Sequence, residues 1–270
     1  MFQRTARVLE HVRLADRTYR LRLACPEVAA AVRPGQFVML RLPHTTDPLL
    51  GRPFALYDLA PDGAALDVVY LVVGKMTGRL VDVKAGDPME VWGPLGKPFP
   101  DVGEVEHVRL VAGGIGQTPF LAYARELLGA RGYGGDAPRR RARAVTLYYG
   151  VRTAALAAGV DDFRAAGVGV KLTSDDGSLG TKGFVTQLLA ADGPGGPVVG
   201  CGPEPMLHAL AKLTAGWGVS CHVSLETPMA CGVGACFSCV TKVKTADGGW
   251  DYKRVCVDGP VFDAAGLVWE

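Results

Sequence analysis

Four cysteines near the C-terminus have a spacing that suits a metal cluster. Cys231, Cys236 and Cys239 form a C-x4-C-x2-C pattern, and the fourth, Cys256, follows after sixteen further residues. This is the plant-type spacing for a [2Fe–2S] cluster. Two glycines between the first two cysteines allow successive backbone N–H groups to point at an anion. The sequence therefore predicts that the four thiolates hold a [2Fe–2S] cluster.

Two other uses of these cysteines are open. A structural zinc site also takes four thiolates, but its usual pairs are C-x2-4-C, and one pair here fits. Disulfides require an oxidising compartment. Of the remaining cysteines, Cys25 and Cys221 lie in apolar runs, and we expect them to be small buried hydrophobic residues.

Composition limits the class of protein. The chain has 270 residues, of which 49% are hydrophobic and 21% charged, as in a globular protein with two or three domains. A formal net charge of +2 gives no electrostatic case for nucleic acid. No apolar run approaches a membrane span, and the charged N-terminal segment lacks the apolar core of a signal peptide. We therefore expect a cytoplasmic protein that binds neither nucleic acid nor membrane.

The elements that must position the chemistry change in type along the chain. Up to about residue 100, short apolar runs alternate with Gly and Pro turns, which predicts a small antiparallel β barrel. Beyond it, strands alternate with helices, which predicts a doubly wound parallel sheet of the α/β class. Strands are expected near 107–112, 144–150, 168–174, 197–202 and 219–226, and helices near 161–166, 183–191 and 204–216. The expected units are a barrel at 1–101, an α/β domain at 102–222 and a cysteine tail at 223–270.

A first candidate ligand site lies on the barrel. The planar fork of Arg52 can grip a pyrophosphate, and the ring of Tyr57 can stack on a flat ligand. The later turn Gly74–Gly78 can present backbone N–H groups and the Thr77 hydroxyl to phosphate. The alternative is a plain hairpin with an incidental arginine.

A second candidate is the glycine-rich segment Ala112–Pro119, between a strand and a helix. Backbone amides and the helix dipole favour a phosphate there, with Thr118 as the N-cap and Pro119 as the first helical residue. The G-x-G-x-x-G fingerprint is absent. A glycine-rich turn without a ligand is the alternative.

A third candidate is the turn Cys201–Met206, which ends a strand and opens a helix. Ligands of doubly wound sheets bind at the carboxyl ends of the strands, so the Cys201 thiol should point into the crevice, unless this is an ordinary strand-end turn. Asp175 and Asp176 would repel a ribose 2′-phosphate, whereas Arg152 would attract it. The arginine-rich loop 131–143 is expected to be a solvated connection, with an anion or partner role as the alternative.

Together these segments resemble the ferredoxin–NADP reductase superfamily. R-P-F-A-L-Y corresponds to its flavin strand, G-G-I-G-Q-T-P to its pyridine-nucleotide loop and C-G-P to its nicotinamide-side turn. The order of barrel, nucleotide domain and cysteine tail narrows the match, as do segments 174–186 and 226–239. Over essentially the whole chain the sequence looks like the electron-transfer subunits of NAD-dependent (class 1B) dihydroorotate dehydrogenases.

The resemblance implies FAD on the barrel, NAD in the second domain and a [2Fe–2S] cluster in the tail. On the flavin side it implies Arg52, Pro53, Phe54, Ala55, Tyr57, Tyr70, Leu71, Val72, Met76 and Thr77. On the nucleotide side it implies Gly113, Gly114, Ile115, Gly116, Thr118, Pro119, Asp175, Cys201, Gly202, Pro203 and Glu204. Many superfamily members carry Ser or Thr at the position of Ala55, whose side chain cannot hydrogen-bond flavin N5.

The resemblance also implies a partner, an FMN-containing dihydroorotate dehydrogenase catalytic subunit, in a heterotetramer with two copies of each chain. Electrons would pass from FMN to the cluster, then to FAD and NAD+, in pyrimidine biosynthesis. No dihydroorotate-binding or other catalytic residues are then expected in this chain.

Three rival functions are open. The first is the small subunit of a ferredoxin-dependent NADH:NADP or sulfide-type oxidoreductase, whose cluster can replace one thiolate by a carboxylate. The second is an oxygenase reductase with a fused ferredoxin, for which the tail is too short to fold alone. The third is a zinc-bearing binding module without redox activity.

Overall fold

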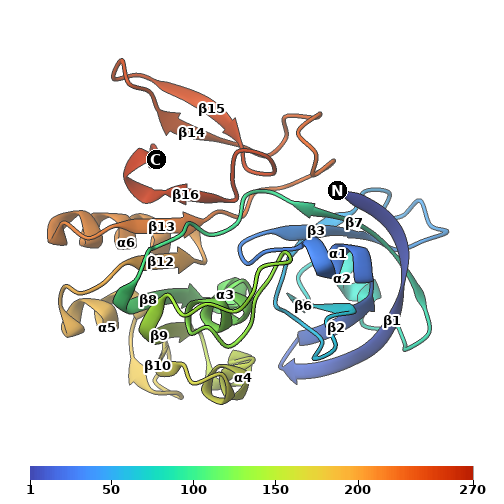
Figure 1. Cartoon of the computed structure of the whole chain (residues 1–270), viewed down its shortest axis with the longest axis horizontal. Coiled ribbons are helices and arrows are strands. Elements are labelled where there is room, and N and C mark those ends of the chain that lie inside the picture. Colours follow the sequence, from blue (N-terminus) through green and yellow to red (C-terminus); the bar gives the residue numbers. More distant parts are fainter. Residues whose placement is uncertain (270) are drawn as a thin grey trace.

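The computed structural model describes residues 1–269 and begins with a curled antiparallel sheet, drawn in blue and cyan in Figure 1. The strand order is β4-β3-β7-β1-β2-β6-β5, and all of the pairs are antiparallel. The strands are β1 (Phe2–Ala15), β2 (Thr18–Ala24), β3 (Phe37–Arg41), β4 (Arg52–Ala55), β5 (Asp58–Leu59), β6 (Ala65–Leu71) and β7 (Pro88–Leu95). Two short helices, α1 (Pro26–Ala31) and α2 (Lys75–Leu80), accompany them.

Alternation of side chains explains this sheet. Along β7 every second residue is buried, so that Met89 and Val91 face the core while their neighbours are partly accessible. Leu21 and Leu23 of β2 are buried in the same core with the same period of two. The expected antiparallel barrel is confirmed as a half-barrel with one apolar interior.

The second sheet has the order β11-β10-β9-β8-β12-β13-β16, and its strands run parallel from β11 to β13. Its strands are β8 (Val105–Gly113), β9 (Ala142–Val151), β10 (Gly169–Ser174), β11 (Thr181–Lys182), β12 (Val198–Cys201), β13 (Cys221–Ser224) and the antiparallel β16 (Val261–Asp263). Its helices are α3 (Phe120–Leu127), α4 (Val160–Ala165), α5 (Val185–Asp192) and α6 (Glu204–Trp217).

Helices cover both faces of this sheet. Leu110 of β8 packs in one core with Phe120 of α3 and Phe163 of α4. The next residue, Val111, packs in the other core with residues of α5 and α6. Because successive strand residues point to opposite faces, the two cores lie on the two sides of the sheet. The predicted doubly wound domain is confirmed.

The start of α3 differs from the expectation. Residues Gly114–Gln117 form a 3₁₀ turn, η1, and the backbone of Thr118 is already helical, with φ −59° and ψ −40°. Pro119 is the N-cap of α3, without a side-chain cap. Thr118 is therefore not the N-cap, because the glycine turn winds directly into the helix and leaves no extended residue for a cap.

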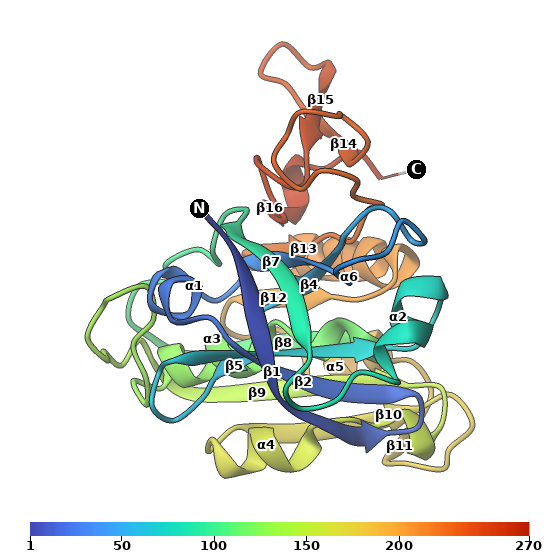
Figure 2. The ribbon, with the colours of Figure 1, turned by 90° about the vertical axis from the view of Figure 1, so that its right-hand side faces the viewer.

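The last part of the chain is the hairpin β14 (Val240–Lys244) and β15 (Trp250–Arg254), after which β16 rejoins the second sheet beside β13. Figures 1 and 2 both place this hairpin, in red, at one end of the molecule. Within residues 1–269, no helix combines the length and the apolar composition needed to cross a membrane.

We predict that Gly116→Ala destabilises the fold. An ideal Cβ at Gly116 would lie 2.2 Å from the carbonyl oxygen of Cys201, so the backbone of β12 would have to shift. Such overpacking costs about 1–3 kcal/mol. Gly216→Ala is the matched control, because a Cβ there, inside α6, meets nothing within 4 Å. Thermal unfolding should show a lower Tm for the first variant and an unchanged or higher Tm for the control; equal Tm values would contradict the close approach.

Candidate functional site

A cavity of about 810 Å³ lies where the barrel, the nucleotide domain and the C-terminal segment meet. Its size is in the range of cofactor sites. Among the residues expected to bind flavin, it is lined by Arg52, Pro53, Phe54, Ala55, Tyr70, Leu71, Met76 and Thr77. Of the residues expected on the nucleotide side, Ile115, Thr118, Pro119 and Cys201 also line it. We call this the flavin cavity.

Arg52 stands at the start of β4 with its side chain held by its own loop. Nη1 donates to the carbonyl oxygens of Leu50 and Gly51, at 2.9 and 3.0 Å. Nε and Nη2 of Arg52 have no hydrogen-bond partner within the described part of the chain, so they can bind a pyrophosphate in the cavity. This arrangement fits the role expected of Arg52.

Tyr57 is not in this cavity. Its side chain is 1% exposed and belongs to the core of the nucleotide domain, where the hydroxyl donates to Asp162 of α4 at 2.6 Å. Burial, followed by the charge of Asp162, raises the pKa of Tyr57 well above its usual value. The expectation that the ring stacks on a ligand is therefore wrong in this structure, because the residue joins two domains instead.

Two other barrel residues are used for structure. The Thr77 hydroxyl accepts the N–H groups of Val73 and Gly74, each at 3.0 Å, and donates to the carbonyl of Gly74. The hydroxyl therefore closes the turn before α2. Thr77 also lines the flavin cavity, and its contact with phosphate stays a prediction. Val72 packs against the barrel core, whereas its neighbours Leu71 and Val73 line the cavity. Val72, which follows the end of β6, does not line the cavity, and its contact with flavin stays a prediction.

A second cavity of about 770 Å³ lies at the carboxyl ends of the parallel strands. It is lined by Gly113, Gly114, Ile115, Gly116, Asp175, Gly202 and Pro203, all of them expected nucleotide residues. Barrel residues Arg17 and Thr18 contribute as well. This nucleotide cavity shares Leu71, Val73, Ile115 and Glu226 with the flavin cavity, so the two are adjacent.

The glycine loop and the Cys-Gly-Pro turn touch through their backbones. An ideal Cβ at Gly202, whose φ is +155°, would lie 2.9 Å from the backbone nitrogen of Gly113. Cys201 is 3% exposed, and burial, followed by the charge of Glu226, raises the pKa of its thiol well above the usual value. The thiol is therefore neutral and borders the flavin cavity.

Two of the charged residues expected near a nucleotide ribose line the nucleotide cavity, and a third does not. Asp175 and Arg152 both line it, whereas Asp176 accepts hydrogen bonds from Ser178 and is not part of the wall. Glu204 lies in a third cavity of about 370 Å³, beneath the hairpin β14–β15, and not in the nucleotide cavity. Glu204, at the start of α6, is therefore not in the wall of the nucleotide cavity, where the sequence predicts it.

Glu226 was missed by the sequence analysis. It follows β13 and lines all three cavities. The cavities make its carboxyl accessible, yet the surrounding protein desolvates the charge and raises the pKa of Glu226. It stands five residues before the first cluster cysteine, and only the three-dimensional structure reveals that it also borders both cofactor cavities.

The four expected cluster ligands come together in two pairs. Cys231 lies close enough to Cys236 to affect the pKa of its thiol, and Cys239 lies close enough to Cys256 to do the same. Hydrogen bonds from Ser238, followed by those from Cys231, lower the pKa of Cys236 to about 6, which favours the ligating thiolate. Within residues 1–269 no group of three or more His, Cys, Asp or Glu side chains is arranged to hold a metal ion. The two neighbouring cysteine pairs match the two cysteines that each iron of a [2Fe–2S] cluster takes.

The barrel packs against the segment 229–239, which carries the first three of the four cysteines and which we call the cluster loop. Trp92 of β7 donates its indole N–H to the carbonyl of Cys231 at 3.2 Å. An ideal Cβ at Gly232, with φ +73°, would lie 2.7 Å from Cγ of Met39 in β3. Met39 packs in one small core with Cys239 and Cys256. The cysteine segment therefore packs against the barrel, and the sequence does not predict this contact.

We predict that Arg52→Ala weakens FAD binding. The change removes a charge-assisted contact of about 1.5–3 kcal/mol, or roughly 10- to 100-fold in affinity. Arg4→Ala is the control, since Arg4 forms an exposed ion pair with Glu27 away from the cavity. Flavin retained after dilution and gel filtration measures the effect. Equal retention by both variants would exclude Arg52 as a flavin ligand.

We predict that Glu226→Gln stabilises the protein at high pH. A raised pKa means that the folded state favours the protonated acid, so stability is lost as pH rises from about 4.3, where an unfolded Glu titrates, through the folded pKa. The variant should have the higher Tm at pH 8, and the difference should shrink toward pH 5. Glu106→Gln, at an exposed side chain of β8, is the control. A difference that does not vary with pH would contradict this origin.

Known proteins match both the fold and the cluster segment. The model for the iron-sulfur cluster binding domain of dihydroorotate dehydrogenase B matches residues 226–268. Among solved structures, that of an NADH-dependent reduced ferredoxin-NADP oxidoreductase superposes with a TM-score of 0.79 and 29% identity, over 98% of this chain and 90% of that chain. Phthalate dioxygenase reductase, 18% identical with a TM-score of 0.66 over 94% of each chain, shares the fold.

Curated relatives match almost from end to end. The electron transfer subunit of dihydroorotate dehydrogenase B (NAD(+)) from Geobacillus kaustophilus is 38% identical over 94% of each chain. The subunit of the same name from Desulforamulus reducens is 35% identical over 98% of each chain. Since the matches span the barrel, the nucleotide domain and the cysteine loop together, the chain belongs to the family of dihydroorotate dehydrogenase B (NAD(+)) electron transfer subunits.

Proposed function

We propose that this chain carries electrons from the FMN of a dihydroorotate-oxidising catalytic subunit, through a [2Fe–2S] cluster and FAD, to NAD+. The observation that carries the proposal is the order of the three sites in space. The cluster loop borders the flavin cavity, and the flavin cavity borders the nucleotide cavity. Family membership supports FAD, the cluster and NAD as the cofactors.

The cluster loop has an outer and an inner side. On the outer side Val233 and Phe237 are 43% and 61% exposed, and Cys236 is exposed between them. On the inner side Met229 and Ser238 line the flavin cavity. A loop with one side on the surface and the other on the flavin cavity can receive electrons from a docked partner and deliver them inward.

The inner cavities suit two-electron chemistry. A bound FAD would supply the chemistry that links single-electron transfer from a cluster to hydride exchange with NAD, and its reduction would take up a proton. Among the described residues that line the flavin cavity, Glu226 is the carboxyl, and desolvation raises its pKa, which favours the protonated acid. Ala55 lines the same cavity without a hydroxyl, so a side-chain bond to flavin N5 is not part of the proposal.

The partner and the division of the chain are also proposals. We propose an FMN-containing catalytic subunit, two copies of each chain in the complex, and functional units at 1–101, 102–222 and 223–270. The names of the curated relatives, which describe an electron transfer subunit, support a catalytic partner. We propose NAD rather than NADP, because the curated relatives are named for NAD(+). In the cavity wall Asp175 would repel a 2′-phosphate and Arg152 would attract it, so the wall does not decide between them.

A second function draws on one comparison. The similarity to an NADH-dependent reduced ferredoxin-NADP oxidoreductase favours the small subunit of such an enzyme. Four cysteines at the cluster and the higher identity of the curated relatives favour the dihydroorotate system. The acceptor used in the assembled complex distinguishes the two.

The test compares the lone chain with the complex. The lone chain should reduce dyes with NADH and should not oxidise dihydroorotate. Adding the catalytic subunit should create dihydroorotate:NAD+ activity. Cys239→Ser, which removes a cluster ligand, should abolish that coupled activity and bleach the cluster's visible absorption, while NADH–dye activity remains. Dihydroorotate turnover by the lone chain would overturn the assignment, and a complex that couples to ferredoxin and NADP instead would establish the second function.

A further inference from the structure

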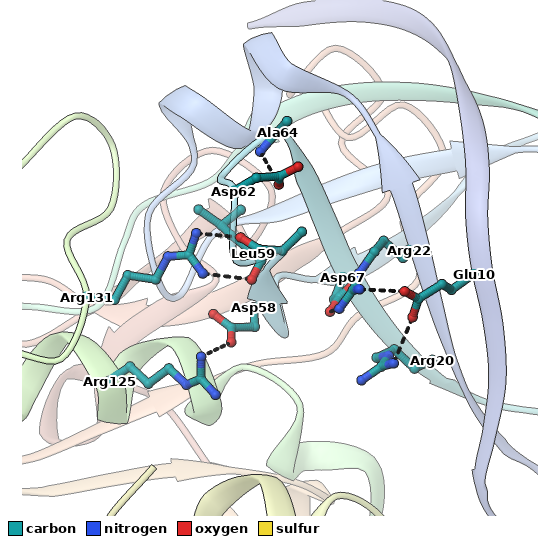
Figure 3. Close-up of polar contacts among 11 residues, drawn as sticks. Glu10, Arg20, Arg22, Asp58, Leu59, Asp62, Ala64, Asp67, Arg125 and Arg131 are labelled. Atoms are coloured by element: carbon teal, nitrogen blue, oxygen red, sulfur yellow. Dashed lines mark hydrogen bonds and ion pairs between the residues drawn. The ribbon is translucent and has the colours of Figure 1, made fainter. Parts of the chain in front are cut away.

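The sequence predicts that the arginine-rich loop 131–143 is a solvated connection. In the structure, part of this loop instead binds the barrel. Arg131 donates from Nη1 to the carbonyl of Leu59 at 2.8 Å and from Nη2 to the carbonyl of Ala60 at 2.7 Å (Figure 3). Both acceptors belong to the barrel, whereas the loop belongs to the nucleotide domain. Arg139, in contrast, forms an exposed ion pair with Glu104 of its own domain. The first part of the loop therefore ties two domains together.

Asp58 is the centre of this contact. Its side chain is buried, and its two carboxylate oxygens accept from two different groups of the nucleotide domain. Tyr133 donates its hydroxyl to Oδ1 at 2.7 Å, and Nη1 of Arg125 in α3 lies 2.8 Å from Oδ2. Figure 3 shows Arg125 pointing from α3 toward Asp58, beside Arg131. A buried carboxylate whose two oxygens are both engaged has one strongly preferred position.

The backbone one residue earlier is fixed as well. The carbonyl of Tyr57 accepts the N–H of Ala122 in α3 at 3.0 Å, while the Tyr57 hydroxyl is bound to Asp162. Every residue of segment 57–60 thus contacts the nucleotide domain, and Leu59 and Ala60 do so through the same partner, Arg131. We call the contacts of Asp58 with Arg125 and Tyr133, and of Tyr57 with Ala122, the domain seam.

The domain seam joins the walls of the two cofactor cavities. On the barrel side, Asp58 follows β4, whose residues line the flavin cavity, by three residues. On the other side, Ala122 and Arg125 lie in α3, which follows the glycine loop Gly113–Gly116 of the nucleotide cavity. The flavin strand is therefore connected to the nucleotide loop through one carboxylate and one short helix.

We propose that Asp58, Arg125 and Tyr133 are positioning residues for hydride transfer between NAD and FAD, an inference that rests on the proposed function. In that step two electrons and one proton leave NADH as a hydride and bond to the flavin, giving NAD+ and reduced FAD. The reacting atoms must lie about 3–3.5 Å apart, and a misplacement of about 1 Å can cost roughly 100-fold in rate. The domain seam sets this spacing because it holds the two cavity walls in one orientation.

The test uses the flavin- and cluster-loaded chain and two measurements. Tyr133→Phe removes one hydroxyl without a change of volume, and Arg125→Ala removes the ion pair. Arg139→Ala is the matched control, since it lies in the same loop and does not touch the barrel. Hydrogen exchange at the Ala122 amide, which is bonded across the domain seam, reports its opening. Stopped-flow reduction of FAD by NADH reports the transfer rate per bound flavin.

Tyr133→Phe and Arg125→Ala should each speed exchange at Ala122 and slow flavin reduction by about tenfold, with FAD content and NAD affinity unchanged, whereas Arg139→Ala should match the wild type. Faster exchange with an unchanged rate would show a purely structural role and overturn the proposal. So would exchange and rate that both stay unchanged in Tyr133→Phe, the variant least able to disturb folding. If the wild-type chain itself fails to reduce FAD with NADH, the proposed function fails rather than the domain seam.

Discussion

The organisation of both cofactor sites depends on one backbone contact, between the glycine loop after β8 and the turn after β12. Neighbouring parallel strands end there, and their loops approach so closely that a single Cβ at Gly116 would overlap the carbonyl of Cys201. Because no side chain separates them, the two loops form one continuous surface. One side of that surface lines the nucleotide cavity, and Cys201 and Ile115 extend it into the flavin cavity. The contact therefore makes the two cavities neighbours.

The shared wall of these cavities combines apolar groups with few charges. Leu71, Val73 and Ile115 are the apolar residues common to both cavities, while Glu226 is the ionisable group common to both. A low local dielectric raises the pKa of that carboxyl and keeps the Cys201 thiol neutral. A wall with few ionised groups suits the passage of electrons and of one proton better than the binding of a charged substrate.

Local patterns were sufficient to predict a large part of this molecule. The flavin strand, the glycine loop and the four cysteines were found because each function needs particular residue types at a short spacing, as with Arg52 at the start of β4. The two fold classes followed from hydrophobic periodicity. The errors concern residues whose roles depend on distant partners. Tyr57 was placed in the wrong site because Asp162, more than a hundred residues later, binds its hydroxyl. Glu226 was missed because no local pattern marks a carboxyl that packing brings between cavities.

The packing of the cysteine loop on the barrel has a consequence for biosynthesis. Met39 and Trp92, which contact that loop, belong to the first hundred residues, whereas the cysteines lie among the last forty. Domains generally fold as units during synthesis, the N-terminal one first. The surface that receives the cysteine loop is therefore complete before the ribosome has made the cysteines. We therefore expect iron and sulfide to be inserted after the barrel surface has formed. Cluster insertion would then be a late step in the maturation of the chain, and it would depend on a correctly folded barrel.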